Sequence, residues 1–207
     1  SPGLYGKKKE LPFLLHNAIP HIKRNRSIII VEGEFDAISM HLLGHKHTVS
    51  ARGTSFTDDF VDIVDNLGIN DVILMYDNDT AGIIGIEQVY KKLKHKDLQV
   101  YVKPLPEGYD PDRCLAEGYD FDFSTKKDVI EYLLTTKPEF NDSRYDVHQR
   151  YRNVIRFLTE NVSLKVMLKK YAMEVVANMF GFFWEDVYND IDNYINNKLT
   201  SDKVVTQ

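Results

Sequence analysis

The sequence has 207 residues, of which 43% are hydrophobic and 12% aromatic, so we expect one large folded domain or two small ones rather than a disordered chain. The formal net charge of −5 argues against an overall basic nucleic-acid-binding protein, although it leaves nucleic acid open as a substrate of a local site. The single cysteine, Cys114, excludes an internal disulfide and a cysteine-based zinc cluster within this chain, and it fits a reducing, cytoplasmic setting. No apolar stretch approaches the ~18 residues of a membrane span, and no secretory leader opens the chain.

A basic lead-in occupies residues 1–26. It contains three consecutive lysines, Lys7, Lys8 and Lys9, and its first residues, SPGLYGKKKE, indicate a sequence that begins inside a longer protein. Its apolar stretch, LPFLLHNAI, is compatible with a helix or with an irregular packed segment.

Strand and helix patterns alternate from Ser27 to Pro106. The runs SIIIVEG, HTVSARGT, DVILMYDND and LQVYVKPLP are typical of strands, because continuous β-branched and apolar runs mark strands that are buried on both faces of a parallel sheet. The stretches between them have helical spacing, and we expect Gly44 to end the first helix and Thr57 to cap the second. This order predicts an α/β fold over residues 27–125, with about four mainly parallel strands and helices on both faces.

The character of the sequence changes after residue 125. Four stretches show helical spacing without a strand signal, and Gly181 is expected to end the third of these helices. Residues 126–199 are therefore predicted to form an all-α helical subdomain, followed by a loose tail at residues 200–207.

Acidic residues stand at the carboxyl ends of the predicted strands, which is where sites lie in open parallel sheets. Gly33 permits the tight bend that presents the acid before it. The six acidic candidates are Glu32, Asp36, Asp77, Asp79, Asp110 and Asp112. Converging carboxylates repel one another unless a cation lies between them, and hard divalent ions prefer oxygen ligands. The pattern predicts a metal site for phosphoryl chemistry, whereas any one of these motifs taken alone is compatible with a solvated turn or a helix cap.

Two of these motifs resemble the signature of the Toprim family. VEGEFDAISM is similar to E-G-x-x-D, and YDNDTAG is similar to D-x-D-x-x-G. The Toprim domain is the shared catalytic fold of bacterial-type primases, of type IA and type II topoisomerases and of some nucleases. The segments SARGTSFTDDFVDIV, PLPEGYDPDRCL and SPGLYGKKKELPFL further resemble bacterial-type (DnaG-like) DNA primases of cellular or phage origin. The final helices resemble the helical subdomain of the primase polymerase domain.

The resemblance implies the Toprim part of a DNA primase, which synthesises short RNA primers for DNA replication by metal-dependent nucleotidyl transfer. Glu32, Asp77 and Asp79 would then be the catalytic metal ligands, and the other three acids would help to hold a second ion. One to three Mg²⁺ or Mn²⁺ ions are implied, with no zinc in this fragment. The implied partners are a single-stranded DNA template, ribonucleoside triphosphates and, in the full-length protein, a replicative helicase, without a membrane. The residues expected to bind nucleotide or nucleic-acid phosphates are Lys7, Lys8, Lys9 and Arg52.

The sequence departs from the primase pattern at two positions. Thr80 stands where primases usually carry an arginine, and Arg52 stands where a small or apolar residue is common. One hypothesis is that Arg52 supplies the missing positive charge to the same phosphate region. Two other functions stay open: a Toprim nuclease that cleaves phosphodiesters with the same acids, and a non-catalytic Toprim module that binds nucleic acid or a partner protein.

Overall fold

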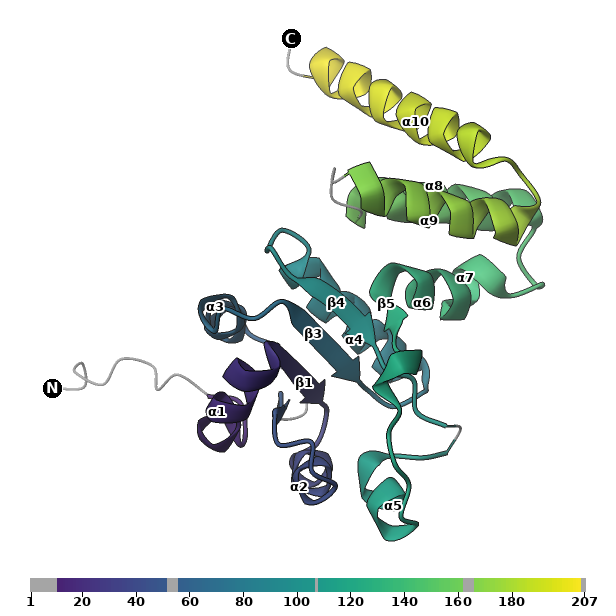
Figure 1. The fold of residues 1–207 in the computed structure, drawn as a ribbon. Coiled ribbons are helices and arrows are strands. Elements are labelled where there is room, and N and C mark those ends of the chain that lie inside the picture. Colours follow the sequence, from purple (N-terminus) through teal and green to yellow (C-terminus); the bar gives the residue numbers. More distant parts are fainter. Residues whose placement is uncertain (1–10, 52–55, 107, 162–165, 206–207) are drawn as a thin grey trace, which may run out of the picture. The chain divides into compact units, whose positions relative to one another are not determined.

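The computed structural model describes residues 11–51, 56–106, 108–161 and 166–205, and Figure 1 shows how they fold. The chain divides into two units, Ser1–Val129 and Ile130–Gln207. The first unit contains the sheet and all six acidic candidates. The second unit is helical.

The first unit is built on a five-stranded sheet with the strand order β2-β1-β3-β4-β5. Its strands are β1 (Ser27–Val31), β2 (Thr48–Ser50), β3 (Asp71–Met75), β4 (Gln99–Val102) and β5 (Lys127–Asp128). The first four are parallel, as the alternation of strand and helix signals predicts. The edge strand β5 is an addition to the four expected strands, and it pairs antiparallel with β4. Its two polar residues carry no local strand signal, because their pairing depends on β4.

Five helices and one short 3₁₀ turn surround this sheet within the part of the unit that the structure describes. They are α1 (Leu15–Asn25), α2 (Glu34–Leu42), α3 (Asp58–Asn66), α4 (Thr80–Leu93), α5 (Pro111–Ala116) and η1 (Phe123–Thr125). The apolar lead-in segment is thus helical from Leu15 onward, whereas Phe13 before it forms an isolated β-bridge with Ser50. Thr57 caps α3, because its side chain accepts a hydrogen bond from the backbone N–H of Phe60. Gly44 follows the end of α2 with a φ of 96°, which favours glycine.

The central strands β1 and β3 are buried on both faces of the sheet. Ile29, Val31, Ile73 and Met75 form one core with α2 and α5, to which Met40 and Cys114 contribute. Because side chains alternate along a strand, Ile28, Ile30, Val72 and Leu74 point to the opposite face, and all four are buried. Tyr76 follows the same alternation and lies on that opposite side, where its ring is close to Gly85 of α4.

The second unit consists of helices. They are α6, which begins at the last residue of the first unit (Val129–Thr136), α7 (Pro138–Asn141), α8 (Val147–Asn161), α9 (Val166–Phe180) and α10 (Trp184–Val205). Gly181 ends α9 with a φ of 73°, as expected. The last helix corrects one expectation, because residues 200–205 continue α10 where a loose tail was expected. No glycine or proline interrupts this stretch, so nothing in the local sequence stops the helix.

None of the helices that the structure describes is long and apolar enough to cross a membrane.

Candidate active site

The carboxyl ends of β1 and β3 bring the first two acidic motifs together. These strands are parallel neighbours, with Val31 opposite Met75, so the residues that follow them leave the sheet side by side. The backbone N–H of Asp77 donates a hydrogen bond to Glu32 Oε1 over 3.1 Å. The two motifs are 45 residues apart in the sequence and are joined directly in the structure.

The loop after β1 folds the acid of the first helical turn back over its own backbone. Asp36 Oδ2 accepts a hydrogen bond of 2.9 Å from the N–H of Gly33. A Cβ atom at residue 33 would lie 2.7 Å from the same oxygen, so any other residue here would displace the Asp36 carboxylate. Gly33 thus leaves space for Asp36 beside Glu32, whereas the bend itself does not require glycine, because Gly33 has an extended backbone with a φ of −96° and a ψ of 155°.

The start of α4 lies unusually close to the Asp77 backbone. Asp79 is the N-cap of α4, and its Oδ1 accepts a hydrogen bond of 2.8 Å from the N–H of Gly82. A Cβ at residue 82 would lie 2.0 Å from the carbonyl oxygen of Asp77, a distance that no side chain tolerates. The absence of a side chain at Gly82 therefore lets the start of α4 approach the Asp77 backbone closely.

The third acidic motif opens α5. Asp110 is the N-cap and accepts a hydrogen bond of 2.7 Å from the N–H of Arg113, with Pro111 in the first turn. Asp112 Oδ1 accepts a bond of 2.9 Å from the hydroxyl of Ser39 on α2. Ser39 was missed in the sequence analysis, because a contact across 73 residues leaves no local signal.

The raised pKa values of Glu32 and Asp36 show that other carboxylates of this edge lie near them. Burial raises the pKa of Glu32, and the negative charges of Asp77, Asp79 and Asp36 raise it further, against the hydrogen bond from the Asp77 N–H. Burial also raises the pKa of Asp36, with contributions from Asp77, Asp110 and Asp112. The charges of the other acidic candidates thus act on Glu32 and Asp36 at one edge of the sheet.

The pKa of Asp77 is raised as well. Burial of the carboxyl group is the largest cause, and the charges of Asp79 and Asp110 add to the effect. In the part of the chain that the structure describes, the Asp77 carboxylate accepts no hydrogen bond, unlike those of its neighbours. It is thus the acid of this group whose oxygens are most available to a cation.

The donor set fits a divalent metal ion. All six side chains offer hard carboxylate oxygens, which Mg²⁺ and Mn²⁺ prefer, and a cation would offset the repulsion that helps to raise the pKa of Glu32, Asp36 and Asp77. Among the described residues, no three His, Cys, Asp or Glu side chains are gathered closely enough to be ligands as they stand.

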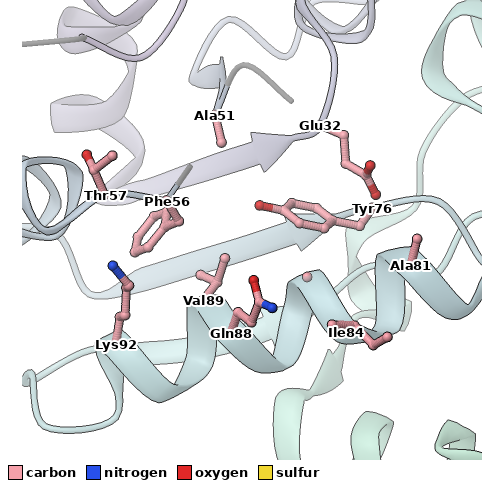
Figure 2. Close-up of a pocket in the computed structure, with 11 residues that line it drawn as sticks. Glu32, Ala51, Phe56, Thr57, Tyr76, Ala81, Ile84, Gln88, Val89 and Lys92 are labelled. Atoms are coloured by element: carbon pink, nitrogen blue, oxygen red, sulfur yellow. The ribbon is translucent and has the colours of Figure 1, made fainter. Parts of the chain in front are cut away.

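A pocket of about 540 Å³ adjoins Glu32 on the α4 side of the sheet. Figure 2 shows the ring of Tyr76 across its middle, with α4 below it and Phe56 at the far side from Glu32. Its lining residues are Glu32, Ala51, Phe56, Thr57, Tyr76, Ala81, Ile84, Gly85, Gln88, Val89 and Lys92. The sequence analysis did not anticipate this pocket, because its walls come from four separate segments.

The basic candidates Lys7, Lys8, Lys9 and Arg52 lie outside the described residues, so their expected role stays a prediction. Thr80, which replaces the usual arginine, is the first residue of α4 and is exposed.

A family model described as Toprim-like matches residues 29–115. These residues form a Toprim-like domain. The match begins within β1, ends within α5 and includes all six acidic candidates. The Toprim-like domain of primases generally implies the use of divalent metal ions.

Outside this domain the chain is also similar to DNA primases. It is 29% identical to the DNA primase of Staphylococcus aureus (strain MSSA476) over 195 residues, which cover 89% of this chain and 31% of that protein. It is 31% identical to the DNA primase of Chlamydia pneumoniae over 135 residues, covering 63% of this chain and 23% of the relative. The chain thus spans less than a third of the length of these relatives.

Solved primase structures share the fold. The Escherichia coli primase catalytic core superposes with a TM-score of 0.67 at 21% identity, covering 88% of this chain and 60% of that one. A DnaG primase catalytic domain bound to single-stranded DNA gives the same TM-score and identity, covering 86% of this chain and 58% of that chain. The likeness includes most of the helical second unit as well as the Toprim-like domain, since it covers more of the chain than residues 29–115.

Proposed function

We propose that this chain is the catalytic Toprim part of a DNA primase, which makes short RNA primers by transferring ribonucleotides on a DNA template. The observation that carries the proposal is the direct contact of Glu32 with the Asp77 backbone at the acidic edge of a Toprim-like domain. The similarity to DNA primases over 89% of the chain supports the choice of primer synthesis among the Toprim activities.

The proposed metal ligands are Glu32, Asp77 and Asp79, with the three remaining acids holding a second ion at the rim. Bound Mg²⁺ or Mn²⁺ supplies the Lewis acidity that phosphoryl transfer requires. The Asp77 N–H holds the Glu32 carboxylate at the end of β1, so that its second oxygen can face the reacting phosphate. The alternative role for Glu32, in place of metal binding, is to accept a proton from an attacking 3′-hydroxyl, which its raised pKa favours.

The rim acids position the elements around the site. Asp110 caps α5, and Asp112 fastens α5 to α2 through Ser39. Helix α2 starts directly after the loop that carries Glu32. The contact between Ser39 and Asp112 therefore limits how far α5 can move away from α2 and from this loop. We therefore assign Ser39 a positioning role.

The proposed substrates are ribonucleoside triphosphates and a single-stranded DNA template, and the proposed partner of the full-length protein is a replicative helicase. Lys7, Lys8, Lys9 and Arg52 are proposed to bind the phosphates, with an affinity that falls as salt rises. The proposal includes a cytoplasmic location, where a replication enzyme meets its template.

The test is primer synthesis by the full-length protein on single-stranded DNA with labelled ribonucleotides and Mg²⁺ or Mn²⁺. Asp77→Asn should lower the rate at least ~100-fold, the scale of losing one charge-stabilising group. Asp62→Asn removes the same charge from an exposed position on α3 and should leave the rate unchanged.

Three outcomes would overturn the proposal. The first is full activity in Asp77→Asn. The second is cleavage of labelled DNA or RNA with metal but without nucleotides, together with no primer synthesis, which would identify a Toprim nuclease. The third is binding of metal and nucleic acid without either reaction, which would identify a non-catalytic module.

A further inference from the structure

The pocket beside Glu32 shares only this residue with the six acidic candidates, because the other five acids lie outside its lining. Its volume of about 540 Å³ lies within the range of roughly 300–1,000 Å³ that small-molecule sites occupy. Since Glu32 belongs to both, a ligand in this pocket would extend directly to the acidic edge. The pocket therefore provides space for the part of a substrate that does not react.

The walls of the pocket are mainly apolar and aromatic. Phe56 is 8% exposed, and its ring lies 4.6 Å from that of Phe60 between centroids, so its position is fixed by packing. Tyr76 is equally buried, and a Cβ at Gly85 would lie 3.0 Å from its ring. The absence of a side chain at Gly85 lets the ring lie close against α4. Two fixed aromatic rings in one pocket suit a flat ligand.

Two polar groups in the pocket have unused hydrogen-bonding capacity. The Tyr76 hydroxyl and the Gln88 amide form no hydrogen bond with any residue that the structure describes. Figure 2 shows Gln88 rising from α4 toward the Tyr76 side of the pocket. A glutamine amide offers donors and an acceptor in one plane, which is the arrangement that recognises the edge of a nucleobase.

The charges of the pocket argue against an anionic group inside it. Lys92 is the one cation among its described lining residues, and its Nζ pairs with Asp58 Oδ1 at 2.7 Å. Glu32 contributes a negative charge at the opposite end. Phosphates would therefore be held at the acidic edge through divalent ions, whereas a neutral group is preferred within the pocket.

We propose that this pocket binds the base of a nucleotide whose phosphates lie at the acidic edge. The base would lie between the aromatic side chains and form hydrogen bonds with Gln88 and with the Tyr76 hydroxyl. This inference rests on the proposed function, because it assigns the subsite of a substrate that the proposed reaction consumes.

The test uses ribonucleosides, which have a base but no phosphate, and omits divalent metal. Saturation-transfer NMR is recorded on the 207-residue chain with adenosine, guanosine, cytidine and uridine in turn. We expect the base protons of at least one nucleoside to receive more saturation than its ribose protons. Gln88→Leu should weaken that binding about tenfold, and Gln88→Phe, which fills the pocket, should abolish it.

The matched control is Gln149→Leu, which makes the same exchange at an exposed position of α8 in the second unit and should not change the affinity. Gln88 is itself exposed on α4, so its variants should fold. Unchanged binding in Gln88→Phe, or no saturation of the base protons of any of the four nucleosides, overturns the inference.

The outcome is separable from that of the proposed function, because nucleoside binding requires neither metal nor polymerisation. If nucleosides do not bind while Asp77→Asn abolishes primer synthesis, the base site is wrong and the primase proposal stands. If the base site is confirmed but the full-length protein makes no primers, the primase proposal fails instead.

Discussion

The backbone N–H of Asp77 donates to Glu32 Oε1, so the carboxylate of one strand end is held by the backbone of the next. This contact fixes Glu32 without neutralising it, because an N–H group carries no net charge. The repulsion among the acids of this edge therefore persists in the folded chain and raises the pKa of Glu32, Asp36 and Asp77. The carboxylates at this edge of the sheet therefore favour the binding of a cation, and their repulsion lowers the stability of the metal-free fold.

Neutralising Glu32 should stabilise the metal-free protein. Glu32→Gln keeps the carbonyl oxygen that accepts from Asp77 but removes one of the repelling charges. Because the folded-state pKa of Glu32 is raised above its ordinary value of 4.5, its ionisation at neutral pH works against folding, and removing it should increase the free energy of unfolding by about 0.5 kcal/mol after solvent screening. Urea unfolding at pH 7 in EDTA measures this. The control is Glu185→Gln, which neutralises an exposed acid in the first turn of α10 and should not increase the free energy of unfolding.

Divalent metal should raise the melting temperature of the chain, because an ion bound only to the folded state stabilises it by mass action. With the metal at about 100 times its Kd, the gain is about 2.7 kcal/mol. Asp77→Asn should lose this Mg²⁺-dependent increase, and Asp62→Asn should retain it. Thermal unfolding with and without EDTA checks the difference, and an equal increase in both variants would remove Asp77 from the ligand set.

Gly82 should be intolerant of even a methyl group. Gly82→Ala places a Cβ 2.0 Å from the Asp77 carbonyl oxygen, so the loop must move or the first turn of α4 must open. We expect a loss of about 2–3 kcal/mol, at the upper end of overpacking effects. Gly85→Ala is the comparison, since its Cβ would meet the Tyr76 side chain at 3.0 Å and a side chain can move more easily than backbone. Similar unfolding free energies in the two variants would contradict this account.

His47 should make the fold sensitive to mild acid. Burial lowers its pKa to about 4 in the folded chain, with further contributions from His45, His21 and His41. In the unfolded chain it takes up a proton near pH 6.5, so between about pH 6.5 and 4 the unfolded state binds more protons and stability falls with the pH. Below about pH 4 both states are protonated and this loss is complete.

Between pH 7 and 5, His47→Gln should therefore lose less stability than the unsubstituted protein, by about 1 kcal/mol after allowance for the exposed part of the ring. Chemical unfolding at the two pH values measures the change. His148→Gln, at an exposed position of α8, serves as the matched control and should leave it unaltered. An identical pH dependence for all three proteins would show that His47 has no such role.

The exposed face of α2 should tolerate polar residues. Phe35 and Leu42 are 78% and 69% exposed, whereas Met40 on the same helix is fully buried. Phe35→Gln and Leu42→Gln should each change the unfolding free energy by less than about 0.5 kcal/mol, while Met40→Ala should cost about 2–5 kcal/mol. A loss above about 1 kcal/mol in either glutamine variant would mean that this face is packed in solution.

Local sequence patterns were sufficient to predict the alternation of strands and helices and the acids that follow the strands. Long β-branched runs such as SIIIV and DVILM commit the chain to buried parallel strands, because no other local structure suits them. Once β1 and β3 are parallel neighbours, Glu32 and Asp77 must leave the sheet at the same edge. Caps such as Thr57 and stops such as Gly181 were predictable for the same reason, since their signals are local.

Other features of the fold and the site depend on contacts between segments that are far apart in the sequence, and these could be identified only in the folded chain. Strand β5 exists because β4 offers its free edge, and Ser39 reaches Asp112 only after α5 has docked on α2. The pocket beside Glu32 likewise requires the loop after β2, the end of β3 and α4 to come together. Which face of α2 is buried was also settled by the neighbours, because the sheet and α5 accept Met40 and leave the larger Phe35 outside. Local sequence propensity does not predict these contacts, because each of them joins segments that are distant in the sequence and meet only in the folded chain.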